Sequence, residues 1–187
     1  IQTLTLQPAN NNSNEINFAG NSVTNGSAHD IDLDAGAWTI GGVTWYLRGA
    51  FKFDFSSIPA SATILSAKLS LFTNPTPING DIINANSGSS NGFYIRRITN
   101  SWDGNVATWQ TQPTTTSANQ FVVPHTSQSS LDLIDLDVKN LVSDMMSSGN
   151  YGFMMILQNE VIYNIRQFCS SNHSQASKHP KIVITYQ

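Results

Sequence analysis

Hydrophobic and polar positions alternate along much of the chain. From Val43 to Phe55 the odd positions are apolar except for Gly49, and the even positions carry Thr, Tyr, Arg, Ala, Lys and Asp. A period of two is typical of a half-buried β-strand. The pattern therefore predicts one long strand, bent at Gly49, with Phe51 and Phe53 among the residues that face a core.

Shorter segments of the same character predict the other strands. They cover residues 15–18, 28–34, 63–72, 93–98, 121–123, 131–136, 152–157, 162–168 and 182–186. Turns rich in Asn, Gly and Ser separate them, as at Asn10 to Asn14 and Asn84 to Gly92. Many strands without long helices between them predict an all-β sandwich or barrel.

One helix interrupts the strand pattern. Apolar residues recur at helical spacing from Val138 to Met145, Asp137 is an acceptable N-cap, and Gly149 stands where a left-handed residue is favoured. A short helix is expected to cover one end of the sandwich. No repeat, linker or second domain is evident, so residues 1–187 are expected to form a single domain.

Composition narrows the class of protein. Charged residues make up 11% of the chain, against roughly 25% in an average soluble domain, and the polar residues that replace them suit a secreted or cell-surface domain. The net charge of −3 does not suggest a nucleic-acid partner. No apolar segment approaches the roughly 20 residues of a membrane span, so membrane insertion is not expected. The single Cys169 excludes an internal disulfide and is expected to be buried and unreactive.

Several motifs resemble those of one family, in the same order. They are Arg48-Gly49-Ala50-Phe51-Lys52-Phe53-Asp54-Phe55-Ser56-Ser57-Ile58-Pro59, Thr63-Ile64-Leu65-Ser66-Ala67-Lys68-Leu69-Ser70-Leu71, Ser101-Trp102 with Val106-Ala107-Thr108-Trp109, Asn150-Tyr151-Gly152-Phe153, and Pro180-Lys181-Ile182-Val183-Ile184-Thr185-Tyr186. The pattern resembles DNRLRE-type domains, close to carbohydrate-binding module family 96, from about Ile16 to Tyr186. This resemblance implies an antiparallel jelly-roll β-sandwich, attached to secreted or surface proteins of bacteria, that binds polysaccharides, including acidic ones.

The chain departs from the family pattern at two places. It reads Ser170-Ser171-Asn172 where the family commonly has a charged pair, and the loop from Asn74 to Gly92 is longer and more polar. Trp102 and Trp109 could stack on a sugar ring. Because both match framework positions of the family, the resemblance assigns them to packing.

The outward face of the long strand is the first candidate for ligand binding. Tyr46, Arg48 and Lys52 share one parity and are expected to point away from the core. An aromatic ring between long cations can stack on a sugar and bind a carboxylate or sulfate. The alternative is a solvated sheet face, or an ion pair of Arg48 with Asp54.

Two further candidates lie outside this strand. Trp38, between Gly36 and Gly41, is expected on a turn, where an aromatic side chain is free to be a ligand platform or to cover the core. Tyr163 and Arg166 form a weaker candidate pair near the end of the sandwich.

Acidic residues give the candidate metal sites. Asp30, Asp32 and Asp34 alternate on one strand face, and calcium takes six to eight oxygen ligands. A structural calcium is therefore a candidate cofactor here. A second acidic run, residues 132–137, is a weaker candidate because Asp137 is expected to cap the helix.

Catalytic patterns are absent. The histidines have no metal-ligand spacing, and the sequence lacks a nucleophile elbow, a phosphate-binding glycine loop and a dinucleotide fingerprint. The sequence therefore predicts a non-catalytic carbohydrate-binding module of a secreted or cell-surface bacterial protein, acting as a monomer, with an acidic polysaccharide among the expected ligands. The alternative is a structural or adhesive surface domain that binds a protein partner.

Overall fold

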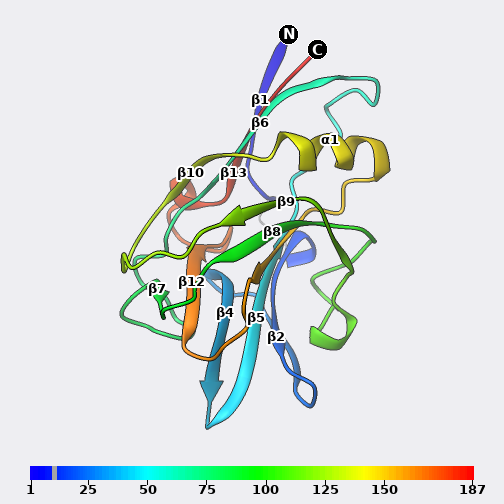
Figure 1. Cartoon of the computed structure of the whole chain (residues 1–187). Helices are drawn as coiled ribbons and strands as arrows, with labels where there is room; N and C mark the ends of the chain where they lie inside the picture. The colour runs from blue at the N-terminus through cyan, green and yellow to red at the C-terminus, as the bar shows by residue number, and fades with distance from the viewer. Residues whose placement is uncertain (10–11) are drawn as a thin grey trace.

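Two antiparallel β-sheets and one α-helix make up the fold (Figure 1). The computed structural model describes residues 1–9 and 12–187. The smaller sheet has the order β1-β13-β6-β10, with the bounds Gln2–Leu6, Lys181–Tyr186, Ile64–Leu71 and Leu133–Asp137. Gln2 pairs with Tyr186, so both chain ends lie together at the tip of this sheet.

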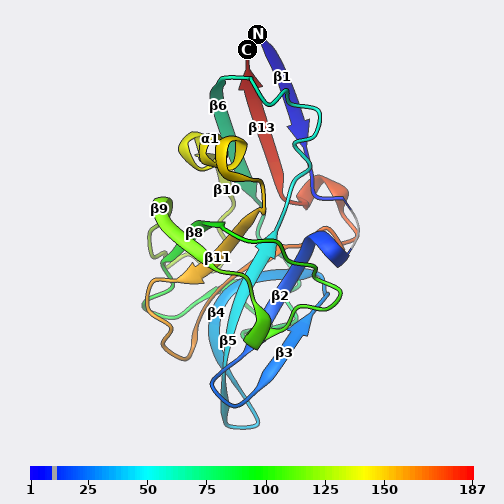
Figure 2. The same ribbon diagram turned by 90° about the vertical axis from the view of Figure 1, so that its right-hand side faces the viewer.

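The larger sheet curls beneath the smaller one (Figure 2). Its order is β7-β12-β4-β5-β11-β8-β9, and β2 and β3 extend it from the other edge of β5. The bounds are β2 Glu15–Gly20, β3 Asn25–Ala28, β4 Asp32–Ile40, β5 Val43–Phe51, β7 Asn86–Ser87, β8 Phe93–Ile98, β9 Thr115–Val123, β11 Phe153–Leu157 and β12 Asn164–Cys169. β5 pairs with β4 over residues 43–48 and with β11 only at Ala50 and Phe51, which turns the sheet at that point.

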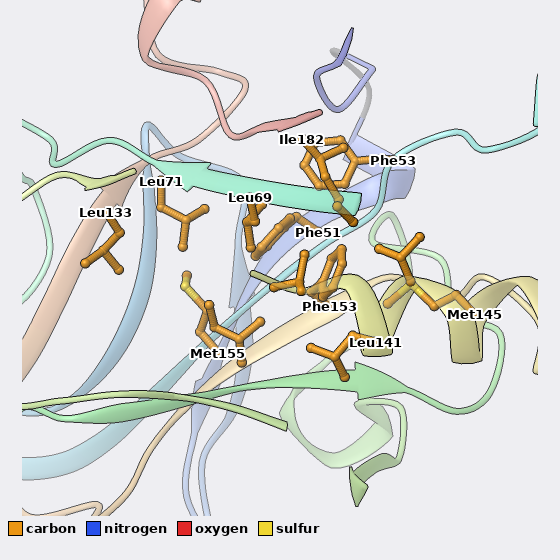
Figure 3. Close-up of a cluster of buried hydrophobic side chains, with 14 of the residues drawn as sticks. Phe51, Phe53, Leu69, Leu71, Leu133, Leu141, Met145, Phe153, Met155 and Ile182 are labelled. Atoms are coloured by element: carbon orange, nitrogen blue, oxygen red, sulfur yellow. The ribbon is translucent and has the colours of Figure 1, made fainter. Parts of the chain in front are cut away.

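The main core lies between the two sheets and the helix α1, Lys139–Ser148 (Figure 3). Phe51 and Phe153 stack with their ring centroids 5.5 Å apart, and Phe53 meets both rings edge-on. The helix contributes Leu141 and Met145 to the same cluster. The predicted alternation of the long strand is confirmed in part. Its phenylalanines are buried, but Ala50 of the opposite parity is buried as well and Val43 is exposed.

A second, smaller core lies on the other side of β5. It joins Ile16 and Phe18 of β2 with Ala50 and Met154, and residues 99–114 fold over it. Trp102 covers this cluster, packs edge-on against Phe18 and donates its indole N–H to the Tyr151 carbonyl at 2.7 Å. The assignment of Trp102 to packing thus agrees with its surroundings.

The prediction of an all-β sandwich with one helix is confirmed. The helix begins at Lys139 behind an N-cap at Val138, and the Asp137 carboxylate accepts the Lys139 N–H, so the sequence placed the cap within one residue. Gly149 has a φ of 104°, as its position predicted. β1, β3 and β7 were not predicted. β3 and β7 are short and polar, whereas β1 does alternate, with Thr between Leu4 and Leu6, and could have been predicted.

Several predicted boundaries were wrong, among them the start of β9, which lies at Thr115 and not at residue 121. Residues 28–34 are not one strand, because β3 ends at Ala28 and the Asp30 carboxylate accepts the Asp32 N–H in a turn. The long strand ends at Phe51, where the Lys52 N–H bonds to the Asn14 carbonyl instead of a sheet neighbour. Trp38 lies within β4 and not on a turn, since the chain reverses at the two glycines 41 and 42, which have positive φ.

Part of one expected turn is not described. Residues 10 and 11 of the turn expected at Asn10 to Asn14 lie outside the described residues, whereas Asn12–Asn14 form a short 3-10 helix. Within residues 1–9 and 12–187, no helix is long and apolar enough to cross a membrane.

Candidate functional site

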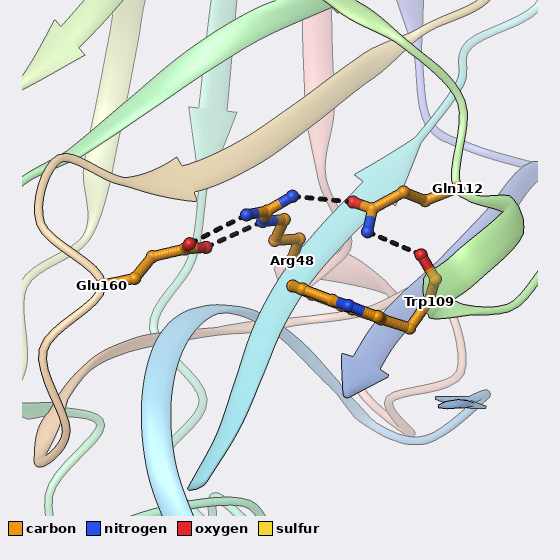
Figure 4. A network of polar contacts seen from close by, with 4 residues as sticks. All are labelled: Arg48, Trp109, Gln112 and Glu160. Atoms are coloured by element: carbon orange, nitrogen blue, oxygen red, sulfur yellow. Dashed lines mark hydrogen bonds and ion pairs between the residues drawn. The ribbon is translucent and has the colours of Figure 1, made fainter. Parts of the chain in front are cut away.

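The predicted residues Tyr46 and Arg48 lie in a half-exposed group of side chains, here called the Arg48–Trp109 cluster. Its members are Tyr46 and Arg48 from β5, Trp109 and Gln112 from residues 108–112, and Glu160 from the loop between β11 and β12 (Figure 4). Three segments far apart in the sequence thus meet on one surface.

The guanidinium of Arg48 organises the cluster. Its Nε and Nη2 donate to the two oxygens of Glu160 at 2.7 and 2.8 Å, and its Nη1 donates to Gln112 Oε1 at 3.0 Å. Such a two-pronged pair fixes both side chains in orientation as well as in distance. The side chains of Arg48 and Glu160 are 23% and 24% exposed, so water reaches the pair.

Trp109 provides the aromatic surface of the cluster. The Arg48 guanidinium carbon lies 4.5 Å from its ring centroid, and Tyr46 stacks on it at 5.9 Å. A Cβ on Gly20 would lie 2.6 Å from the indole, so the glycine at the end of β2 is what lets the ring lie close to the sheet. The Gln112 amide donates to the Trp109 carbonyl at 2.7 Å and anchors the same segment.

The expected ion pair of Arg48 with Asp54 is wrong. Asp54 is exposed, and it accepts the Ser56 N–H at 2.9 Å instead. That hydrogen bond lowers the pKa of Asp54. The partner that holds Arg48, Glu160, lies 112 residues away in the sequence, and no local pattern relates the two.

Lys52 does not join Tyr46 and Arg48. It lines a separate groove of about 630 Å³ between the end of β5 and α1, together with Asn14, Asp54, Met146 and Asn150. β5 ends at Phe51, so Lys52 lies beyond the strand whose parity relates Tyr46 to Arg48.

Trp38 and Tyr163 meet on the other side of β4. Their rings pack edge to face, with centroids 5.3 Å apart and planes at 89°. Tyr163 is 53% exposed and has a φ of 67°, which is uncommon for a residue with a side chain. The two predicted candidates are therefore brought together, but away from Tyr46 and Arg48, because Trp38 and its neighbour Ala37 point to opposite faces and Ala37 is the residue paired with Tyr46.

Arg166 does not accompany Tyr163 at the surface. It is 0% exposed, between the rings of Phe93 and Phe168, and it donates to Asn86 Oδ1 and to the Pro124 carbonyl. Burial lowers its pKa to about 10. The expectation that Arg166 contacts a ligand fails for this reason.

The three predicted metal-binding aspartates lie in a buried polar cluster. Asp32 and Asp34 are buried, and Asp30 is half-buried beside them. The Asn17 amide nitrogen lies 3.5 Å from Asp30 Oδ1 and 3.1 Å from Asp34 Oδ2. As placed, no group of three or more His, Cys, Asp or Glu side chains among residues 1–9 and 12–187 is positioned to hold a metal ion.

Burial dominates the electrostatics of this acidic cluster. It raises the pKa of Asp32, against hydrogen bonds from the Ile78 N–H and the Asn74 amide that lower it. It raises the pKa of Asp34 well above its ordinary value, and the charges of Asp32 and Asp30 add to the effect. Asp32 and Asp34 therefore resist ionisation unless a cation compensates the charge.

The cysteine and the histidines have structural positions. Cys169 is buried, as predicted, and burial raises its pKa to about 12, so the thiolate nucleophile is disfavoured. His29 contacts the Gly104 carbonyl, His125 contacts Asn91, and His179 contacts the His173 carbonyl. These contacts hold loops and assemble no nucleophile–base pair.

The comparison with family models gives one match. The model of carbohydrate-binding module family 96 matches residues 45–186, which is most of the chain. No curated protein matches the chain significantly. The matched region contains most of β5, the folded-over segment 99–114 and the loop with Glu160, and so the whole Arg48–Trp109 cluster. The chain therefore belongs to carbohydrate-binding module family 96.

Proposed function

We propose that this chain is a non-catalytic carbohydrate-binding module of a secreted or cell-surface protein, and that the Arg48–Trp109 cluster is its glycan site. Family membership supports binding of carbohydrate. The observation that selects this surface is a half-exposed indole surrounded by side chains already fixed by hydrogen bonds. A ring face for the C–H side of a sugar, with polar groups at its border, is the usual form of such a site.

The charge of the cluster favours a neutral sugar. Each guanidinium nitrogen of Arg48 already has a partner, and Glu160 cancels its charge at 2.7 Å. An acidic sugar would have to displace Glu160 or lie against it, and like charges at short range repel. Neutral hydroxyl groups can instead use the remaining lone pairs of Glu160 and Gln112. The acidic polysaccharide expected from the family would have to bind elsewhere, with the Lys52 groove as the place to test.

A binding screen against neutral and acidic polysaccharides tests the proposal. Gln112→Ala and Trp109→Ala should each weaken binding at least about tenfold, which is about 1.4 kcal/mol. The matched control is Tyr163→Ala, which removes an exposed aromatic ring outside the cluster. Equal binding by all variants would exclude this surface, and release of reducing ends from any polysaccharide would contradict the non-catalytic assignment.

An adhesive role is the second candidate, and one apolar surface favours it. Ile78, Ile82 and Ile83 are exposed on the loop between β6 and β7, Ile83 to 84%. A Cβ on Gly80 of this loop would approach the Trp38 ring at 3.4 Å, so the loop passes beside the Trp38–Tyr163 pair. Exposed apolar residues around an aromatic pair suit a protein partner. Loss of partner binding in Ile83→Ser, with glycan binding absent from the wild type, would support this role.

A further inference from the structure

Several carboxyl groups meet in the acidic cluster, and the hydrogen-bond donors around them are uncharged. Four carboxyl side chains meet there, from Glu15 on β2, Asp30 in the turn before β4, and Asp32 and Asp34 on β4. Neither ion pair of the described residues, Arg48–Glu160 and Lys68–Asp137, involves any of them. Amide, backbone N–H and hydroxyl groups hold the cluster together.

Asp32 is the well-satisfied member. Its Oδ1 accepts from the Asn74 amide, and its Oδ2 accepts from the N–H groups of Ile78 and Asn79 at 2.8 and 3.1 Å. This carboxylate therefore fastens the long polar loop over β4. Its charge is spread over several donors, and it does not need a further partner.

Asp34 is not satisfied in the same way. Its Oδ2 accepts from the amides of Asn17 and Asn79, but its Oδ1 is buried without any hydrogen-bond partner. A buried carboxylate oxygen without a partner is costly. One position on β4 thus combines full burial, an unused oxygen and two acidic neighbours.

A neutral side chain from another strand, that of Gln167, also has a buried oxygen without a hydrogen-bond partner. Gln167 of β12 lies directly opposite Asp34, so both side chains leave the same face of the sheet. Gln167 is 0% exposed, and its Nε2 lies 3.4 Å from Asp32 Oδ2. Its Oε1, on the same carbon as that nitrogen, has no partner. Unused oxygens of different chemical types therefore lie on the same buried face of the sheet, on residues directly opposite each other.

Two carboxylates already converge on a single point. The Asn79 amide nitrogen lies 3.1 Å from Asp30 Oδ2 and 2.9 Å from Asp34 Oδ2. A cation between these two oxygens would meet both, and Asn79 would offer its own oxygen if its amide turned over and drew back to make room. Since no three acidic side chains of the described residues share one point, amide oxygens have to complete the coordination.

We infer that Asp30, Asp34 and the amide oxygens of Asn79 and Gln167 bind one calcium ion, on the face of β4 opposite to the Arg48–Trp109 cluster. Calcium takes carboxylate, amide and water oxygens in a flexible arrangement of six to eight ligands. Magnesium requires a near-ideal octahedron, which this irregular set does not provide. The ion would neutralise the buried charge and secure the loop that carries Asn79.

Metal analysis of the purified chain tests the site directly. After removal of metals with EDTA and dialysis against calcium chloride, we expect about one calcium per chain. The Tm should rise by about 5 °C or more at calcium roughly one hundred times its Kd. Magnesium at the same ionic strength should raise the Tm less than calcium does. A chain that retains no calcium and shows no change in Tm would overturn the inference.

Three variants distinguish neutralisation of the acidic cluster by a cation from neutralisation by protons. Asp34→Asn should abolish calcium retention, whereas Asp135→Asn, which changes an exposed carboxylate elsewhere, should not. Asn79→Asp should bind calcium several-fold more tightly, because it supplies a third carboxylate at the same point. If protons alone compensate the cluster, Asn79→Asp only adds repulsion, so it would lower the Tm and gain no affinity for calcium. Calcium binding that persists in Asp34→Asn would place the ion elsewhere. Glycan binding is not a readout, so this inference and the proposed function can fail separately.

Discussion

Arg48 and Arg166 show how strongly the surroundings decide what an arginine does. Arg48 is paired with a carboxylate and remains open to water. Arg166 has no carboxylate partner, is fully buried, and leaves its Nη2 without a hydrogen bond. Its guanidinium lies 5.5 and 5.7 Å from the ring centroids of Phe93 and Phe168, so packing and ring contacts replace an ion pair.

The buried position of Arg166 predicts an order of stability among its variants. Arg166→Ala should lower the free energy of unfolding by roughly 2–5 kcal/mol, because it leaves a cavity. Arg166→Met should lose less, because it keeps the volume and removes a desolvated charge. Urea unfolding with a common m-value measures both. An alanine variant as stable as the methionine variant would contradict a packing role.

Glu15 predicts a pH dependence of stability. Burial raises its pKa from about 4.5 to about 7, against two hydrogen bonds from Ser171 that lower it. A raised carboxyl pKa means that the folded state holds the proton more tightly. Stability from this group is therefore complete below about pH 4.5 and is lost as the pH rises to about 7, roughly 3 kcal/mol at 1.36 kcal/mol per pKa unit.

Glu15→Gln should make this loss smaller. The variant keeps an oxygen for the Ser171 donors but does not titrate, so the decline in unfolding free energy from pH 5 to pH 7.5 should become shallower. Urea unfolding in EDTA at several pH values measures it. An unchanged slope would mean that Glu15 ionises normally in the folded chain.

At the scale of elements, alternation predicted the structure well where one face is buried and the other wet. β8 has its predicted bounds, and α1 starts within two residues of its predicted cap. The prediction of one half-buried strand over residues 28–34 was wrong because both faces of β4 are buried, one among apolar residues and one around Asp32 and Asp34. The acidic residues there alternate like an exposed face, so the sequence did not reveal their burial.

The candidate site could be predicted only in part for a related reason. Tyr46 and Arg48 share a strand, and parity placed them together. Trp109, Gln112 and Glu160 come from loops, where no period relates sequence to direction. Trp109 was assigned to packing because its position matches the family framework, and its half-exposed indole does pack against the second core while it also borders the cluster.

Variants of helix α1 test whether its buried face is what attaches it to the sandwich. It packs against β6, and its buried face consists of Leu141, Val142 and Met145. Leu141→Ala should lower the free energy of unfolding by about 2–5 kcal/mol, because it opens a cavity in the main core. Lys139→Ala, at an exposed position of the same helix, should change it by less than about 0.5 kcal/mol. Urea unfolding compares them, and equal losses would mean that the helix is not docked through this face.

At the scale of the whole molecule, the small number of charged residues limits the kinds of interaction through which the chain can bind a ligand. The net charge is −3, and charged residues are only 11% of the chain. Long-range attraction of a polyanion is therefore unfavourable. Of the nine lysines and arginines, Arg166 is buried, and Arg48 and Lys68 are held in ion pairs. Binding through hydrogen bonds and ring contacts suits this surface better than binding through charge.

This balance predicts how glycan binding responds to salt. If the Arg48–Trp109 cluster binds a neutral glycan, the Kd should change less than about twofold between 0.05 and 0.5 M NaCl, because stacking and hydroxyl contacts involve no mobile counterions. A carboxylated form of the same polysaccharide should bind more weakly at low salt and approach the neutral form at high salt, as screening removes repulsion from Glu160. Titration of both forms at the two salt concentrations measures this. Tighter binding of the carboxylated form at low salt would mean that a basic surface, such as the groove at Lys52, recruits the ligand instead.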